Sequence, residues 1–256
     1  MIIIPYIRYN PNMLGFNTDI EFLEEEKSCS YFDDKISDTR YLVQNNCDAN
    51  TAYGLLSRGW RRFGRMSFVP ECKTCNDCVS IRIDVQKYKF SKSEKRVLAK
   101  NKNVEIHIQK PSISMEHLSL YNKYHKHMSN KKNWKFNEIT PDDYYNSYVD
   151  GAKNYGKEIL YFINDELVCV ALCDFFSEGI SSVYCYYDHN YEEFSLGKFS
   201  ILKQIQLAKE NNIPFVYPGY WIKDHFSMGY KEKYKPFEYL ANRPKLEENP
   251  IWRDYE

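Results

Sequence analysis

A short polar segment with three evenly spaced cysteines constrains this chain more than any other feature of its sequence. Cys72, Cys75 and Cys78 lie three residues apart. Two residues between successive cysteines let the chain fold back, so the sulfurs can converge on one ion or cluster. Disulfide pairing and a turn that merely contains thiols are the two plainer interpretations. The spacing favours a metal site or a reactive redox site.

The charge balance limits the partners of the chain. Among its 256 residues, 35 are Lys or Arg and 35 are Asp or Glu, so the formal net charge is zero. Proteins that grip long nucleic acid nonspecifically are usually strongly basic. We therefore expect no DNA partner, and any RNA contact must be a local patch.

The first residues do not resemble a secretory signal. Met1–Ile4 is apolar, but Pro5 and Arg8 follow too soon for an apolar signal core. No window approaches the ~18 apolar residues of a membrane span, and an irregular segment is expected over residues 1–19. Eight cysteines without a signal are typical of reduced thiols or metal ligands. We expect a cytoplasmic protein that does not contact a membrane.

Arginines surround the cysteine segment. The sequence predicts one strand over Trp60–Val69, in which aromatic residues alternate with Arg61 and Arg62. These arginines either protect an exposed sheet edge or form a pocket for an anion, because a guanidinium presents paired donors to carboxylate or phosphate. Arg82 lies in a second predicted strand, Val79–Val85, on the face opposite its apolar neighbours.

Capping patterns predict three helices, which begin after Asp48 or Asn50, after Ser91 and after Thr140. The second helix, Lys92–Lys102, is the densest positive segment of the chain. It forms either a solvated face or a landing site for an RNA backbone. Another predicted helix, Met115–Met128, carries His117 and His125 two turns apart. No acidic residue is in register with them, which favours ordinary packing over a metal site.

Several motifs occur in one order along most of the chain. They are, from Gly59 onward, GWRRFG, VPECKTCNDCVSIRI, SKSEKR, DFFSEGISSVY, SLGKFS, GYWI, MGYK and PFEYL. Over roughly Cys29 to Leu240 the chain resembles the aminoacyl-tRNA–protein transferases of the N-degron pathway. It is most similar to their bacterial branch, the aspartate/glutamate leucyltransferases. Several motifs in a fixed order are far more specific than any single one.

The second half of the chain has the pattern of the GNAT acyltransferase fold, on which this family is built. Three strands over Ile159–Ile163, Leu167–Phe176 and Ile180–Tyr187 predict an antiparallel meander, which an amphipathic helix, Leu196–Glu210, and a strand from Phe215 follow. We expect an α+β fold with a GNAT-like, mixed but largely antiparallel sheet and an N-terminal cysteine-containing α/β region. The predicted units are residues 1–100, with the cysteines and the basic helix, and a catalytic unit over residues 101–256.

The loop before that helix argues against acetyl-coenzyme A. GNAT enzymes bind its pyrophosphate with several glycines, whereas this loop has Gly197 alone together with Glu192 and Glu193. A GNAT-fold acetyltransferase of small amines remains an alternative that coenzyme A binding would reveal. A non-catalytic metal-knuckle protein that binds RNA is the other, although the neutral charge and the GNAT-like half argue against it.

The resemblance implies transfer of an amino acid from charged tRNA to the N-termini of proteins that begin with Asp or Glu, which marks them for degradation. Leucine is the expected amino acid and arginine the alternative. The ester that joins an amino acid to tRNA is already activated, so the protein must mainly align the partners, accept a proton and stabilise the oxyanion. The chemistry requires no cofactor.

The resemblance also implies roles for individual residues. Strands at Tyr184–Tyr187 and Tyr217–Tyr220 are expected to splay and to bind the extended acceptor terminus. The candidate residues are Asp174, Tyr184 and Glu238 for the acceptor amine, Arg62, Arg82 and Lys231 for the acceptor carboxylate, and Arg61, Lys95, Arg96, Tyr220 and Trp221 for tRNA. Lys231 has a phosphate as its alternative ligand. Each of these side chains has the alternative of an ordinary sheet or core contact.

In the family, a cysteine at the position of Cys29 lies beside the cysteine turn. It would add a fourth sulfur to Cys72, Cys75 and Cys78, and four thiolates suit zinc and an iron–sulfur cluster equally well. Eukaryotic relatives have a further cysteine close by, where this chain has Phe32. The cysteines are therefore predicted to gather, with zinc or a cluster as candidate occupants.

Overall fold

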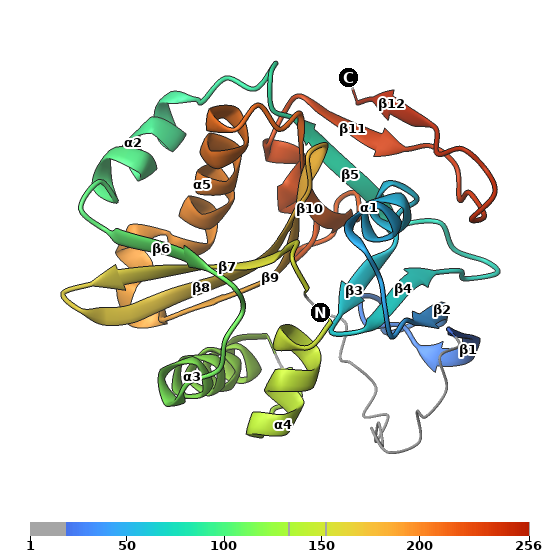
Figure 1. The fold of residues 1–256 in the computed structure, drawn as a ribbon, viewed down its shortest axis with the longest axis horizontal. Coiled ribbons are helices and arrows are strands. Elements are labelled where there is room, and N and C mark those ends of the chain that lie inside the picture. The colour runs from blue at the N-terminus through green and yellow to red at the C-terminus, as the bar shows by residue number, and fades with distance from the viewer. Residues whose placement is uncertain (1–18, 133, 152, 256) are drawn as a thin grey trace.

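A large mixed sheet takes strands from both halves of the chain (Figure 1). The computed structural model describes residues 19–132, 134–151 and 153–255. The eight-stranded sheet has the order β12-β11-β5-β10-β9-β8-β7-β6. Its strands are β5 (Val79–Asp84), β6 (Glu105–Gln109), β7 (Gly156–Ile163), β8 (Glu166–Phe175), β9 (Gly179–Tyr187), β10 (Phe215–Trp221), β11 (Phe237–Leu240) and β12 (Trp252–Asp254).

Helices cover both faces of this sheet (Figure 1). One face packs on α5 (Leu196–Glu210), beside which lies α2 (Lys92–Lys100), and the other face packs on α3 (Met115–Lys132). The short α4 (Pro141–Tyr144) continues as a π-helix, Tyr145–Val149. Because both faces are covered, β8 is buried along nearly its whole length.

The meander β7-β8-β9 and helix α5 are confirmed as predicted. β9 and β10 then run parallel over only three residue pairs, the last of which is Ser181 with Tyr217. Beyond that pair Pro218 has no N–H to donate, and Gly219 adopts a φ of +100°. The register of β10 against β5 shifts at the same place. β9 and β10 therefore separate, which gives the sheet the split expected of a GNAT-like fold.

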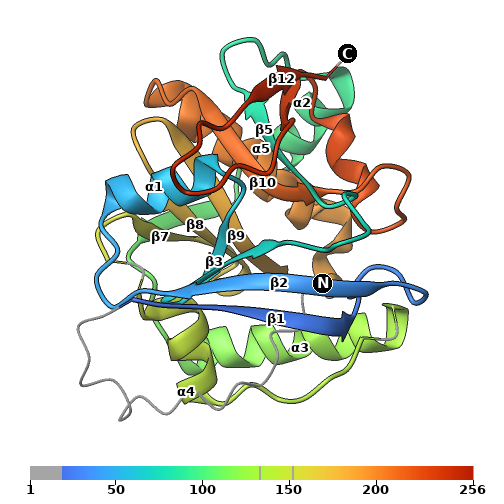
Figure 2. The same cartoon turned by 90° about the vertical axis from the view of Figure 1, so that its right-hand side faces the viewer.

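A second sheet lies beside the first and has the order β1-β2-β4-β3 (Figure 2). Its strands are β1 (Ile20–Ser28), β2 (Ile36–Val43), β3 (Arg61–Phe63) and β4 (Met66–Pro70). The single strand predicted over Trp60–Val69 is wrong, because Gly64 and Arg65 turn the chain into a hairpin. Gly64 has a positive φ, and a Cβ there would collide with the carbonyl of Asn146. The turn therefore brings β3 against the π-helix.

The predicted helix starts are confirmed. Asp48 caps α1 (Ala49–Ser57), Thr140 caps α4, and Ser91 forms a complete capping box with Glu94 at the start of α2. No helix in the described ranges is long and apolar enough to cross a bilayer. The irregular segment predicted over residues 1–19 lies, apart from Asp19, outside the described residues.

The eight-stranded sheet joins the two predicted units. β5 comes from the N-terminal side of residue 100, yet it pairs with β10 on one edge and with β11 on the other. Its buried Ile81 and Ile83 belong to the main hydrophobic core. The division at residue 100 stays a prediction about domain organisation.

Candidate active site

A cleft of about 600 Å³ opens where β9 and β10 separate. Its walls come from β3, β9, β10, the first turns of α5, the end of α3 and the segment Ser227–Tyr234. Five of the predicted site residues line this cleft: Arg61, Arg62, Tyr184, Tyr220 and Lys231. Residues from the whole length of the chain thus meet at one place.

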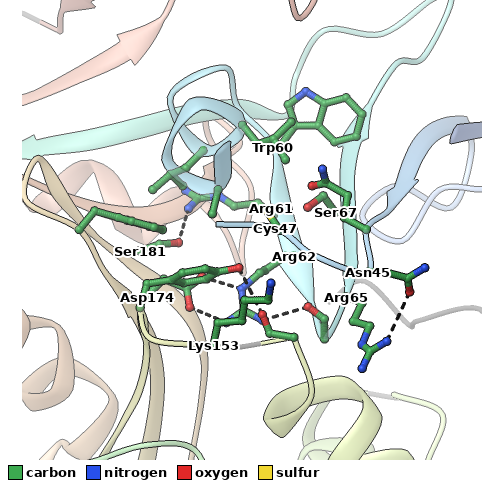
Figure 3. Close-up of a pocket in the computed structure, with 18 residues that line it drawn as sticks. Asn45, Cys47, Trp60, Arg61, Arg62, Arg65, Ser67, Lys153, Asp174 and Ser181 are labelled. Carbon is green, nitrogen blue, oxygen red and sulfur yellow. Dashed lines mark hydrogen bonds and ion pairs between the residues drawn. The ribbon is translucent and has the colours of Figure 1, made fainter. Parts of the chain in front are cut away.

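Arg62 forms a two-pronged ion pair with Asp174 (Figure 3). Its Nε and Nη2 donate to the two carboxylate oxygens at 2.8 and 2.5 Å, and both side chains are largely buried. Burial by itself would lower the pKa of Arg62, but the charge and hydrogen bonds of Asp174, with smaller contributions from Tyr155 and Cys47, together raise that pKa. The pair connects β3 to β8, so a predicted acceptor-binding residue and a predicted catalytic residue hold one another.

Arg61 lies next to this pair but has a different environment. Its side chain is buried, with 9% of the residue exposed, and Nη1 donates to Ser181 Oγ at 3.1 Å (Figure 3). Its Nε and Nη2 are buried and make no hydrogen bond with the described residues. The guanidinium also lies 5.9 Å from the ring centre of Tyr220. Burial lowers the pKa of Arg61, which reflects the cost of a cation without a matching anion.

Lys231 is a second buried cation of the cleft. Only 6% of the residue is exposed, and its Nζ donates to the backbone carbonyl of Tyr220 at 2.5 Å. Burial, helped by the charge of Arg61, lowers the pKa of Lys231 to about 7. A Cβ at Gly219 would lie 3.2 Å from this Nζ. The backbone at the split between β9 and β10 therefore makes room for the lysine.

Tyr184 projects from β9 and its hydroxyl lies 3.0 Å from Nε2 of His125, on α3. Burial lowers the pKa of His125 to about 4, so the ring is neutral near pH 7. Burial also raises the pKa of Tyr184 well above its usual value. A neutral imidazole can exchange a hydrogen bond with the phenol, so the pair can orient a proton at the cleft wall.

Arg82 and Glu238 form an ion pair away from the cleft lining. Arg82 Nε and Nη2 contact one carboxylate oxygen at 2.7 and 2.6 Å. The guanidinium lies between the rings of Phe215 and Trp252, at 3.8 and 4.4 Å from their centres. Arg82 and Glu238 are neighbours across the β5–β11 ladder. The structure thus brings them together on the sheet, apart from the other candidate residues.

The residues predicted to bind tRNA fall into three environments. Tyr220 lines the cleft and donates its hydroxyl proton to the carbonyl of Gly59 at 2.8 Å. Trp221 packs in the main core against Phe237. Lys95 and Arg96 are exposed on α2, which packs beside α5, the helix at the cleft. Tyr220 and α2 therefore flank one opening, whereas Trp221 does not face it.

All eight cysteines are free thiols, so the structure does not use the disulfide alternative. Burial, together with the charges of the neighbouring Cys29, Cys72 and Cys75, raises the pKa of Cys78 to about 12. The four predicted cysteines thus gather in one neighbourhood. Within the described parts of the chain, no group of three or more His, Cys, Asp or Glu side chains has the geometry of a metal site. Four thiolates are a donor set that chemically fits zinc or an iron–sulfur cluster.

Sequence reasoning missed several cleft residues. Ser181 was visible only as part of a motif, and nothing in its local sequence indicates that it opposes Asp174 and accepts a hydrogen bond from Arg61. The sequence favours ordinary packing for His125 but does not reveal its contact with Tyr184, which joins residues 59 positions apart. Trp134, after α3, also lines the cleft. A single aromatic residue in the sequence does not indicate whether it packs in the core or faces a ligand.

The three-strand meander, the crossing helix α5 and the parallel strand that separates over a cleft define an acyltransferase of the GNAT type. Family comparison gives a narrower result. Residues 27–96 match the N-terminal model, and residues 116–241 the C-terminal model, of arginine-tRNA-protein transferase. The chain belongs to this family.

Individual relatives point to one branch of the family. An aspartate/glutamate leucyltransferase of Helicobacter hepaticus is 49% identical over 92% of this chain and 98% of its own length. One from Campylobacter jejuni is 46% identical over 91% of this chain and 98% of its own. Among solved structures, FemX aligns with a TM-score of 0.48 and 10% identity, over 73% of this chain and 65% of its own.

Proposed function

We propose that this protein transfers leucine from leucyl-tRNA to the N-terminus of proteins that begin with Asp or Glu. The observation that carries the proposal is the 49% identity, over nearly the full length of both chains, to a relative named aspartate/glutamate leucyltransferase. The cleft supports it, because it contains buried cations suited to an acidic acceptor and lies at the split of an acyltransferase sheet.

The proposed reaction needs little covalent help from the protein. The unprotonated α-amine attacks the ester carbonyl, a C–N bond forms, the C–O bond to the tRNA ribose breaks, and the ribose oxygen takes up a proton. The protein must align the two substrates and exclude water. Tyr184, hydrogen-bonded to His125, is our candidate for orienting the amine or passing its proton to the leaving oxygen. Asp174 is engaged with Arg62 and would act by holding the hairpin β3–β4 in place.

The tRNA would approach along α2 and place its 3′ end in the cleft. The exposed Lys95 and Arg96 supply charge for the acceptor-stem backbone. Lys198, in the first turn of α5, lines the cleft itself. Tyr220 would then contact the aminoacyl end. The proposed RNA contact is confined to one face and uses few basic residues. It is therefore compatible with the zero net charge of the chain.

The gathered cysteines are proposed to stabilise the second sheet. Cys29 follows β1, and Cys72, Cys75 and Cys78 follow β4. Zinc or an iron–sulfur cluster there would tie these two strand ends together and supply folding energy. The proposed transfer reaction itself needs no such group. Free thiols and a charged-tRNA substrate also suit a reaction in the cytoplasm.

The test uses purified protein, leucyl-tRNA or arginyl-tRNA, and peptides that begin with Asp, Glu, Asn or Ala, with the products identified by mass. We expect leucine to be added to the Asp and Glu peptides only. Arginine addition would favour the alternative that the family models name. Tight binding of coenzyme A with acetylation of amines, and no aminoacyl product, would refute the proposal.

A further inference from the structure

Arg61 stands out because a fully buried guanidinium keeps two nitrogen donors without a partner among the described residues. Its Nη1 is satisfied by Ser181, but Nε and Nη2 are not. Leaving a buried charge without a hydrogen-bonding anion is strongly unfavourable. Such an arrangement persists when a ligand supplies the missing anion.

Arg61 differs from the two other candidate arginines in having no acidic partner among the described residues. Arg62 is already held by Asp174, and Arg82 by Glu238. Across the described ranges, no Asp or Glu lies within ion-pair distance of Arg61 or Lys231, although the charge of Asp174 acts on Arg61 from further away. The carboxylates of Asp174 and Glu238 are thus already paired with the other two arginines.

Two buried cations that have no acidic partner among the described residues line one cleft. Both Arg61 and Lys231 line it, and the positive charge of Arg61 acts on the Lys231 ammonium. Tyr220 lies between them, since its ring faces Arg61 and its carbonyl accepts from Lys231. Two like charges that face the same cavity strengthen the demand for an anion there.

Arg61 lies where the first residue of a peptide inserted between β9 and β10 would end. Its partner Ser181 belongs to the last parallel pair before β9 and β10 separate, so Arg61 lies at the apex of the split. A chain terminus that enters between the two strands would bring its first side chain to this apex. A phosphate within an RNA backbone carries a ribose on either side and fits poorly against a side chain with only 9% exposure.

We propose that Arg61, with Lys231 as the second donor, binds the side-chain carboxylate of the acceptor's N-terminal Asp or Glu. The inference rests on the proposed function, and it makes Arg61 the residue that selects acidic termini. An Asp carboxylate would accept from the free Nε and Nη2 in the paired geometry that guanidinium favours. Lys231 would add a hydrogen bond from Nζ to the same group.

The experiment compares peptides that begin with Asp or with Asn, which have nearly the same shape and differ in charge. Their binding to the full-length protein is measured by calorimetry without tRNA, for the wild type and for R61Q. We expect R61Q to bind the Asp peptide at least about 30-fold more weakly and the Asn peptide within about twofold of wild type. R40Q is the control, because Arg40 is paired with Glu21 and Glu71 on the outer sheet.

R61K keeps the inference testable if R61Q does not fold. Lysine retains the charge but cannot donate two parallel hydrogen bonds, so R61K should lose about tenfold for Asp and leave Asn unchanged. Equal losses for both peptides, or an Asp preference as large as that of wild type in either folded variant, would overturn the assignment. A wild-type protein that prefers Asp in binding but transfers no leucine would instead refute the proposed function alone.

Discussion

The cost of burying the Lys231 ammonium in the cleft can be tested quantitatively. Burial lowers the pKa of its ammonium from 10.5 in the unfolded chain to about 7 in the folded protein. Between these two values the unfolded chain binds a proton at this position that the folded protein does not. The contribution of Lys231 to the free energy of unfolding therefore rises with pH in this window. From pH 6 to pH 9 the rise amounts to about 2–3 kcal/mol.

The perturbation is K231M, which keeps a long apolar side chain and removes the charge. We expect K231M to be more stable than wild type at pH 6, because the buried ammonium no longer has to be desolvated. That advantage should shrink by about 2–3 kcal/mol at pH 9, where wild-type Lys231 is neutral. Urea denaturation of both proteins at pH 6, 7.5 and 9 measures the difference.

Taking the difference between the two proteins removes the titration of every other group. K233M controls for the loss of one positive charge, since Lys233 is exposed on the same short helix, Gly229–Lys233. A stability difference between wild type and K231M that does not change with pH would refute the burial argument for Lys231. Loss of transfer activity in a more stable K231M would show that the buried charge is kept for function.

Three further predictions concern residues outside the cleft wall. R82A should lower the free energy of unfolding by about 2–3 kcal/mol, because it leaves the half-buried Glu238 without its charged partner. The variant should slow transfer to all acceptors alike, and a selective loss of Asp and Glu acceptors would contradict this. Reversing Lys95 and Arg96 to Glu should weaken tRNA binding in a filter assay while calorimetry shows unchanged peptide binding, and equal loss of both would indicate misfolding instead. C75S should lower the melting temperature and the metal content of anaerobically purified protein, whereas an unchanged melting temperature and transfer rate would exclude a structural metal.

Local signals in the sequence were sufficient to predict most helices and the meander. A capping residue fixes the first turn of a helix from within a few positions, as at Asp48 and Ser91. The hairpin over β3 and β4 escaped prediction because Gly64 follows GWRRF without the usual paired turn residues. What demands the turn is its contact with Asn146, and a contact 82 positions away leaves no mark in the local pattern.

The site was predictable as a set of residues but not as a set of contacts. The motifs marked Arg61, Arg62 and Asp174 as important, yet a doubled arginine does not reveal which of its members meets the carboxylate. That depends on the register of β8 against β9, which places Asp174 opposite Ser181. Residue type assigns chemistry, whereas the strand register decides which donors are already satisfied.

The adjacent arginines Arg61 and Arg62 explain how the protein can keep a cation without an acidic partner at the apex of the split between β9 and β10. Arg62 and Asp174 form a closed pair that ties the β3–β4 hairpin to β8. That tie fixes the backbone of the preceding residue, so Arg61 is held at the split, where it donates a hydrogen bond to Ser181. A guanidinium held in this way loses little further rotational freedom when an anion arrives. Arg62 thus provides the rigidity and Arg61 the binding energy, so removing the charge of Arg61 would abolish the selection of acidic termini.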